Sequence, residues 1–263
     1  MPSSRRRLRG RRILDRALLW LAVLAAWQAL SWWLGEYWVS APVLVAQRLW
    51  KLAASGDLWF HGRFTLGEAF GGFLLGAVPG CALAMLLRRS QFLRAAIETL
   101  TSVGYAVPKT ALVPLFILWF GVGPEAKVAL VASAIFFIVF YSTLSGVGAV
   151  DVKLLQTVRL LGATEWQLLR NVVWPSVVPY LFGGLRVAIP YAVAGAIVGE
   201  IISSNRGLGY LTQFGAMDFD TTLVFASLAT VASIVLVLNG VLNAIQRRLL
   251  RWQGAEAQAL AAT

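Results

Sequence analysis

The chain carries the stretch VALVASAIFFIVFYSTLSGVGAV at residues 128–150, in which no side chain bears a charge. A helix needs about 20 mainly apolar residues to cross a lipid bilayer, and this stretch is long enough. Apolar and polar residues do not alternate along it, as they would in a strand of a membrane β-barrel. The stretch therefore predicts a transmembrane helix.

Further apolar stretches on both sides of this one repeat the pattern. Hydrophobic residues make up 59% of the 263 residues and charged residues only 13%, against roughly 25% charged in soluble proteins, which excludes an ordinary soluble fold. The chain is predicted to be an all-α, polytopic membrane protein. Its six expected transmembrane helices are Ala17 to Leu34, Thr65 to Leu87, Val103 to Phe120, Val128 to Val147, Tyr180 to Ile202 and Thr221 to Ala244.

Lysine and arginine are unevenly divided between the two sides of the predicted bundle. An even number of spans leaves both termini on one side, and sixteen of the 23 basic residues fall on that side against five on the other. Cytoplasmic loops carry such an excess, so both termini are predicted to be cytoplasmic. The net charge of +11 therefore indicates membrane topology and not nucleic-acid binding.

The spans divide the chain into five parts. Residues 1–16 form a basic cytoplasmic N-terminus, 17–34 the first transmembrane helix, 35–64 an extracytoplasmic connection, 65–246 a five-helix core with a cytoplasmic connection at 148–179, and 247–263 a cytoplasmic tail. In the first extracytoplasmic part, Ser40 is expected to cap an amphipathic helix that lies along the membrane interface. Residues 203–220 are rich in turn-forming side chains, which predicts an outer loop.

Small residues recur at helical spacing in two of the predicted spans. Every fourth residue is a glycine at Gly72, Gly76 and Gly80, and the same spacing separates Gly195 from Gly199. Glycine at this spacing lets two membrane helices approach closely. These five glycines are predicted to serve helix packing.

The sequence lacks the patterns that catalysis or metal binding would require. No lysine follows a glycine, so a phosphate-binding P-loop cannot occur. One histidine, His61, and one cysteine, Cys81, allow neither a multi-histidine metal site nor an intrachain disulfide. We therefore expect no enzyme, metal site or cofactor in this chain. Long side chains near the ends of spans are expected to reach the membrane interface, at Glu68, Lys109, Arg186 and Glu200.

The longest cytoplasmic connection is predicted to fold as two short helices. Residues 151–161 have a helical composition that ends at Gly162. Thr164 and Gln167 form a capping box for a second helix, which Pro175 closes. Such a rigid helical corner can transmit a movement of a soluble partner to the adjoining spans. The alternative is a folded connector that has no partner.

Three stretches resemble a known family. They are PLFILWFGVG at 114–123, the segment 162–179 followed by GLR at 184–186, and EIISSNRGLGYL at 200–211. Together they are similar to the permease subunits of ABC importers, in the branch that carries sulfonates, taurine, nitrate and pyrimidine precursors. The likeness runs from about Trp38 to Trp252.

One segment of the likeness is the coupling-loop pattern of that family, written E-A-A, three residues, G, nine residues, I-x-L-P. Gly162 and Pro175 match it. Gln156 stands at the acidic position and Trp174 at the leucine position, which puts in doubt any ionic contact made there in the family.

The resemblance implies a type I ABC importer permease in a bacterial inner membrane. Its partners would be a second copy of the chain, a cytoplasmic P-loop ATPase dimer that binds ATP and magnesium, and an extracytoplasmic solute-binding protein. It also implies which residues contact the ATPase, namely Gln156, Gly162, Ala163, Thr164 and Pro175.

Polar residues on otherwise apolar spans are candidates for the lining of the solute pathway, with core packing as the alternative. They are Tyr141, Ser142, Thr143, Tyr191 and Asn239. Two other functions stay open on the residues alone. An ion-coupled secondary carrier or channel would need no ATPase and would use Glu68 or Glu200, and a membrane scaffold would move no solute. The sequence does not choose the solute.

Overall fold

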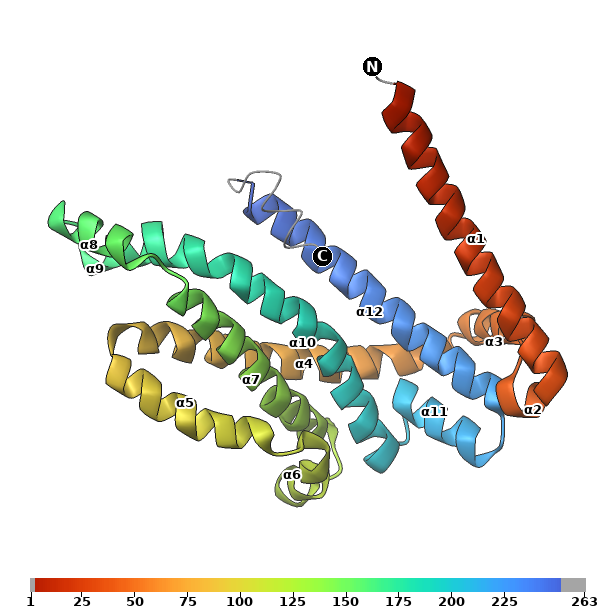
Figure 1. Cartoon of the computed structure of the whole chain (residues 1–263). Helices are drawn as coiled ribbons and strands as arrows, with labels where there is room; N and C mark the ends of the chain where they lie inside the picture. Colours follow the sequence, from red (N-terminus) through yellow and green to blue (C-terminus); the bar gives the residue numbers. More distant parts are fainter. Residues whose placement is uncertain (1–2, 252–263) are drawn as a thin grey trace. The chain divides into compact units, whose positions relative to one another are not determined.

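The computed structural model describes residues 3–251, with side chains from residue 14 onward except at residues 16 and 91. Regular structure in this part of the chain is helical throughout, as predicted (Figure 1). The helices are α1 (Ser3–Leu34), α2 (Glu36–Val39), α3 (Pro42–Ser55), α4 (Asp57–Leu86), α5 (Gln91–Ala106), α6 (Val113–Phe120), α7 (Pro124–Gly148), α8 (Val152–Leu160), α9 (Glu165–Leu168), α10 (Trp174–Ser203), α11 (Leu208–Met217) and α12 (Thr221–Leu249). Most of the tail predicted at 247–263 lies outside the described residues.

Five helical segments among the described residues are long and apolar enough to cross a membrane. They are Ala17–Leu34, Asp57–Arg89, Pro124–Gly148, Glu165–Ser203 and Thr221–Leu249. A sixth candidate is the pair Phe92–Ala106 and Lys109–Phe120, whose axes are bent by 78°. Length and composition therefore allow five spans, or up to six if the bent pair crosses as one.

The break in that pair corrects the prediction of one continuous helix from Val103 to Phe120. Pro108 follows Val107, whose backbone is extended, and proline has no N–H to continue a helix. The Lys109 ammonium group donates hydrogen bonds to the carbonyl oxygens of Gly104 and Val107, at the end of α5. Lys109 thus satisfies backbone groups at the break.

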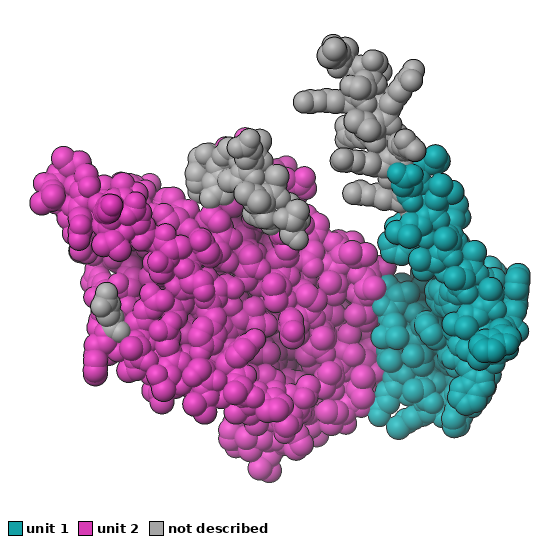
Figure 2. All heavy atoms as spheres, viewed as in Figure 1, with its two compact units in different colours: residues 1–60, 211–230 teal, residues 61–210, 231–263 magenta. Residues whose placement is uncertain are grey.

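The chain divides into two compact units (Figure 2). One contains residues 1–60 and 211–230, and the other contains 61–210 and 231–263. In the first unit, the Trp27 indole donates a hydrogen bond of 3.1 Å to the carbonyl oxygen of Val39, and its ring lies 5.3 Å from that of Phe225. Arg48 of α3 forms an ion pair with Asp220, just before α12.

Two predictions in these connections were wrong. Ser40 does not cap α3, because the helix begins at Pro42 with Ala41 as its N-cap, and the Ser40 hydroxyl lies 2.8 Å from that of Thr222. Proline fits the first turn of a helix, where its missing N–H costs nothing. Residues 203–220 are not a plain loop either, because α11 occupies most of them.

The second unit is organised around α7, which runs beside α10 over much of its length (Figure 1). Its main buried core joins residues of α4, α7 and α10, among them Ala69, Val131, Ile135 and Ala192. Alanine and β-branched side chains dominate it, so the three helices pack at short range.

The five glycines predicted to serve helix packing all lie against α7. A Cβ atom built on Gly76 would lie 2.6 Å from the carbonyl oxygen of Ala132, and one on Gly80 would lie 2.6 Å from that of Phe136. Gly72 and Gly195 both face Val131, and Gly199 faces the side chain of Lys127. Only a residue without a side chain fits at Gly76 and Gly80 unless the backbone shifts.

Candidate functional site

The connection between α7 and α10 folds as the sequence indicates. The Asp151 carboxylate accepts a hydrogen bond of 2.8 Å from the backbone N–H of Lys153 and caps α8. The Thr164 hydroxyl accepts one from the backbone N–H of Gln167, and the Gln167 side chain accepts one of 2.8 Å in return from the backbone N–H of Thr164. This is the predicted capping box, which satisfies donors at the start of α9.

The corner between α8 and α9 depends on Gly162. Its φ angle is +81°, in the left-handed region that side-chain-bearing residues rarely adopt, and a Cβ atom there would meet open space. The N–H of Gly162 bonds to the carbonyl oxygen of Arg159 and that of Ala163 to the carbonyl oxygen of Val158. These bonds fix the direction in which α9 leaves the corner.

Pro175 does not close the second helix, which corrects the prediction. The chain passes from α9 through one π-helical turn, Leu169–Val173, directly into α10. A π-helical turn accommodates an interruption in the hydrogen-bond ladder, and the Ser176 hydroxyl donates a bond of 2.8 Å to the carbonyl oxygen of Val172. The second helix of the connection, the π-helical turn and α10 therefore form one continuous helical segment, Glu165–Ser203.

A cluster of charges holds the two short helices to the end of α4. The Glu165 carboxylate lies 3.0 Å from Arg159, 3.3 Å from Arg88 and 3.9 Å from Arg89. The Glu165 side chain is 45% exposed and those of Arg89 and Arg159 are exposed too, so water screens these two pairs and each contributes little stability. The Arg88 side chain is only 11% exposed, so its pair is screened less. The cluster guides the orientation of the connection without locking it.

Beneath these charges, a small apolar core joins the connection to the spans. Val150, Val172, Val173 and Val177 are buried together, and Met85 of α4 packs against them. These side chains join the connection to α4, α7 and α10 through close apolar contacts.

The outer surface of the connection is apolar at its corner. Leu160 is 88% exposed and Leu161 is 80% exposed, and Trp166 on α9 is also exposed. The predicted coupling residues Gln156, Gly162 and Thr164 are exposed on the same connection, and Ala163 and Pro175 are half-buried. The two leucines were not singled out from the sequence, although consecutive leucines before a glycine corner are a detectable signal.

The opposite end of α10 carries a buried polar network. Glu200 is completely buried; its carboxylate accepts hydrogen bonds of 2.7 Å from the Thr65 hydroxyl and 2.7 Å from the backbone N–H of Gly209. The backbone N–H of Leu208 in turn donates to the Thr65 hydroxyl at 2.8 Å. A side chain at Gly207 or Gly209 would collide with Glu200, which explains the glycines in EIISSNRGLGYL.

An ion pair lies beside this network. The Lys127 ammonium group donates to the Glu68 carboxylate at 3.2 Å and to the Ser204 hydroxyl at 3.2 Å. The Glu68 and Lys127 side chains are 6% and 5% exposed. The prediction that Glu68 and Glu200 reach the membrane interface was therefore wrong, because buried partners hold both carboxylates inside the bundle.

The residues predicted to line a pathway do not form one group. Tyr141 hydrogen-bonds with Thr101 at 3.0 Å, Ser142 lies against Gly184, and Thr143 is completely buried. Tyr191 on α10 is 58% exposed, and the buried side-chain oxygen of Asn239 on α12 has no hydrogen-bond partner among the described residues. His, Cys, Asp and Glu side chains form no group in the described part of the chain that could hold a metal ion.

The model of one protein family matches residues 72–253, which include the connection, its core and the glycines against α7. That family is described as the inner membrane component of binding-protein-dependent transport systems. The chain belongs to this family. It is the permease component of an ABC importer, as the three sequence stretches indicated.

Curated relatives of the permease extend over most of its length. It is 36% identical over 215 residues to a riboflavin transport system permease protein of Chloroflexus aurantiacus, across 82% of this chain and 80% of that one. It is 30% identical over 243 residues to a putative aliphatic sulfonates transport permease protein of Bacillus subtilis, across 90% and 87% of the two chains.

A solved structure shares the fold. The permease aligns with a chain of an inward-facing methionine ABC transporter, with a TM-score of 0.57, 19% sequence identity, and coverage of 78% of this chain and 97% of that one. At this identity the likeness concerns the fold alone.

Proposed function

We propose that two copies of the permease form a transmembrane solute pathway and that residues 151–175 couple it to two cytoplasmic ATPase subunits. An extracytoplasmic binding protein would deliver the solute, and both termini would be cytoplasmic, in a bacterial inner membrane. The ATPase subunits would bind ATP and magnesium. Closure of these subunits would tilt the spans between outward-open and inward-open states.

The observation that carries this proposal is the exposed apolar corner at Leu160 and Leu161. Large, solvent-exposed apolar side chains at the tip of a rigid element are typical of protein contact sites. The tip precedes the corner at Gly162, and the helical segment that leaves this corner, Glu165–Ser203, includes α10. It therefore has both a contact surface and a mechanical path into the spans.

The proposed solute is a small molecule of the sulfonate, taurine, nitrate or pyrimidine-precursor type. The sulfonate permease relative supports this range, and the riboflavin permease relative extends it to a larger ring system. An ion-coupled carrier has less support, because Glu68 and Glu200 are already engaged by Lys127, Thr65 and a backbone N–H.

Replacement of Gly162 by valine tests the coupling role. A side chain in the left-handed region costs about 1–2 kcal/mol, so the α8–α9 corner should change its geometry. We expect the complex to assemble with normal basal ATP hydrolysis but to lose most binding-protein-dependent uptake in proteoliposomes. Gly56→Val is the matched control, because Gly56 also has a left-handed φ, +84°, in open space but lies outside the connection.

Two results would contradict the proposal. Uptake by Gly162→Val equal to that by Gly56→Val would show that the corner does not couple. Uptake by the purified chain alone, driven by an ion gradient without any ATPase, would show that the permease is self-sufficient.

A further inference from the structure

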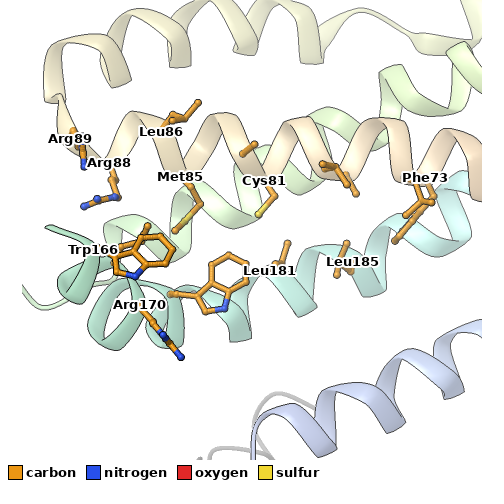
Figure 3. A pocket seen from close by; sticks show the side chains of 16 residues that line it. Phe73, Cys81, Met85, Leu86, Arg88, Arg89, Trp166, Arg170, Leu181 and Leu185 are labelled. Atoms are coloured by element: carbon orange, nitrogen blue, oxygen red, sulfur yellow. The ribbon is translucent and has the colours of Figure 1, made fainter.

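A groove of about 1090 Å³ lies between α4 and α10 (Figure 3). Small side chains on α4, at Ala77, Cys81 and Ala82, leave the space, and Leu181 and Leu185 of α10 face it. From Phe73 to Arg89 the groove follows about 24 Å of helix. One leaflet of the hydrocarbon core is about 15 Å thick, so the groove is long enough for an extended acyl chain.

Charge is confined to one end of this groove. Arg88 and Arg89 lie there, at the end of α4, and Phe73 lies at the other end (Figure 3). Arg170 also lines the charged end, but its guanidinium group points away from the two arginines of α4 (Figure 3). Glu165 pairs with Arg88 and Arg89, which leaves an excess of positive charge. Arg170 forms no ion pair with any described residue.

Two indole rings lie at the same end. Trp166 is 66% exposed and Trp174 is 43% exposed, and both line the groove. Tryptophan collects at the level of lipid headgroups, because its ring is apolar and its N–H can meet water. The charged end of the groove therefore has the side chains of a headgroup region, and the remainder has those of a hydrocarbon region.

We propose that this groove binds an anionic phospholipid, with its phosphate at Arg88 and Arg89 and one acyl chain along α4. Guanidinium groups bind phosphate oxygens in pairs, and basic pockets between membrane helices bind anionic headgroups. A small polar solute fits the groove poorly, since such sites present converging polar groups and the walls from Phe73 to Leu86 are apolar. The lipid would fill the space beside the connection and link its position to the membrane.

The test compares two lipids that differ only in the headgroup. The permease is purified with its associated subunits and mixed with dioleoyl phosphatidylglycerol or dioleoyl phosphatidylcholine, and bound lipid is counted by native mass spectrometry. We expect the anionic lipid to bind about tenfold more tightly. Arg89→Gln should remove most of that preference, because a hydrogen bond to a charged group is lost. Arg248→Gln, which removes an exposed charge at the end of α12, should keep it.

A second pair of variants tests the acyl-chain part of the groove. Ala82→Trp fills the space without a change of charge and should reduce binding of both lipids. Leu75→Trp, on the exposed surface of the same helix outside the groove, should leave binding unchanged. Their unfolding temperatures show that both variants fold.

Three outcomes would overturn the proposal. They are equal affinity for the two lipids, an unchanged preference in Arg89→Gln, and cross-linking of Cys81, which lines the groove, to Cys81 of a second copy of the chain under conditions in which no lipid binds. The last would assign the groove to the contact between two permeases.

Discussion

The continuous helical segment Glu165–Ser203, which includes α9 and α10, holds a glutamate near each end, and the two glutamates have opposite surroundings. Glu200 is fully buried and is bonded to Thr65 and the backbone of Gly209, whereas the Glu165 side chain at the connection is 45% exposed and faces three arginines. A buried polar group depends on each of its partners, because water cannot replace them. An exposed pair can be exchanged for water at little cost. The network at one end therefore stabilises the packing of the helices, whereas most of the ion pairs at the other end can be exchanged for water.

The largest expected effect comes from removal of Lys127 at the buried end. Lys127→Met leaves Glu68 buried without its counter-ion, which should cost roughly 3–5 kcal/mol of stability. The measurement is the unfolding transition of the purified permease in mild detergent, followed by tryptophan fluorescence. The matched control is the double variant Lys127→Met/Glu68→Met, which removes both charges and should recover most of the loss. If the single variant unfolds at the same temperature as the parent, the buried ion pair does not stabilise this end more than the exposed pairs stabilise the other.

A smaller effect on stability is expected at the glycine contacts between α4 and α7. Gly76→Ala adds a methyl group 2.6 Å from the carbonyl oxygen of Ala132, so α4 and α7 must separate, at a cost of about 1–3 kcal/mol. Gly183→Ala is the control, because no atom lies within 4 Å of its added methyl group and alanine favours a helix. The control should unfold at the same temperature as the parent or above it. Equal losses in both variants would refute close packing as the reason for Gly76.

The smallest effect on stability is expected at the exposed end. Glu165→Gln frees Arg88, Arg89 and Arg159 from their shared partner, yet the unfolding temperature should change little, because Glu165, Arg89 and Arg159 are solvated and the glutamine can still accept a hydrogen bond from Arg88. Binding-protein-dependent ATP hydrolysis should change instead, since the connection loses its orientation relative to α4. Lys153→Gln, an exposed charge in α8 outside the cluster, is the control for charge alone. A large loss of stability in Glu165→Gln would show that this end is as rigid as the other.

Local patterns were read correctly where neighbours in the sequence supply the interaction. The capping box of Thr164 and Gln167 and the end of α8 before Gly162 involve bonds across a few residues, so the sequence predicts them directly. Pro175 was misread, because the π-helical turn before it and the buried valines around it override the usual effect of proline. Ser40 was misread because Pro42 starts the helix and Thr222, far away in the sequence, takes the serine hydroxyl.

The sequence by itself determined that this protein is a helical membrane permease. The evidence for this lies in consecutive residues: uncharged runs long enough to cross a membrane, the glycine corner and the stretches that resemble the family. Helix formation and hydropathy depend mainly on such neighbouring residues. Only the tertiary structure decided that Glu200 and Glu68 are buried with Thr65 and Lys127, that the third apolar stretch is bent at Pro108, and that a groove with a basic end lies between α4 and α10. Each of these depends on contacts between side chains that are far apart in the sequence, and the hydropathy pattern along the chain does not specify those contacts.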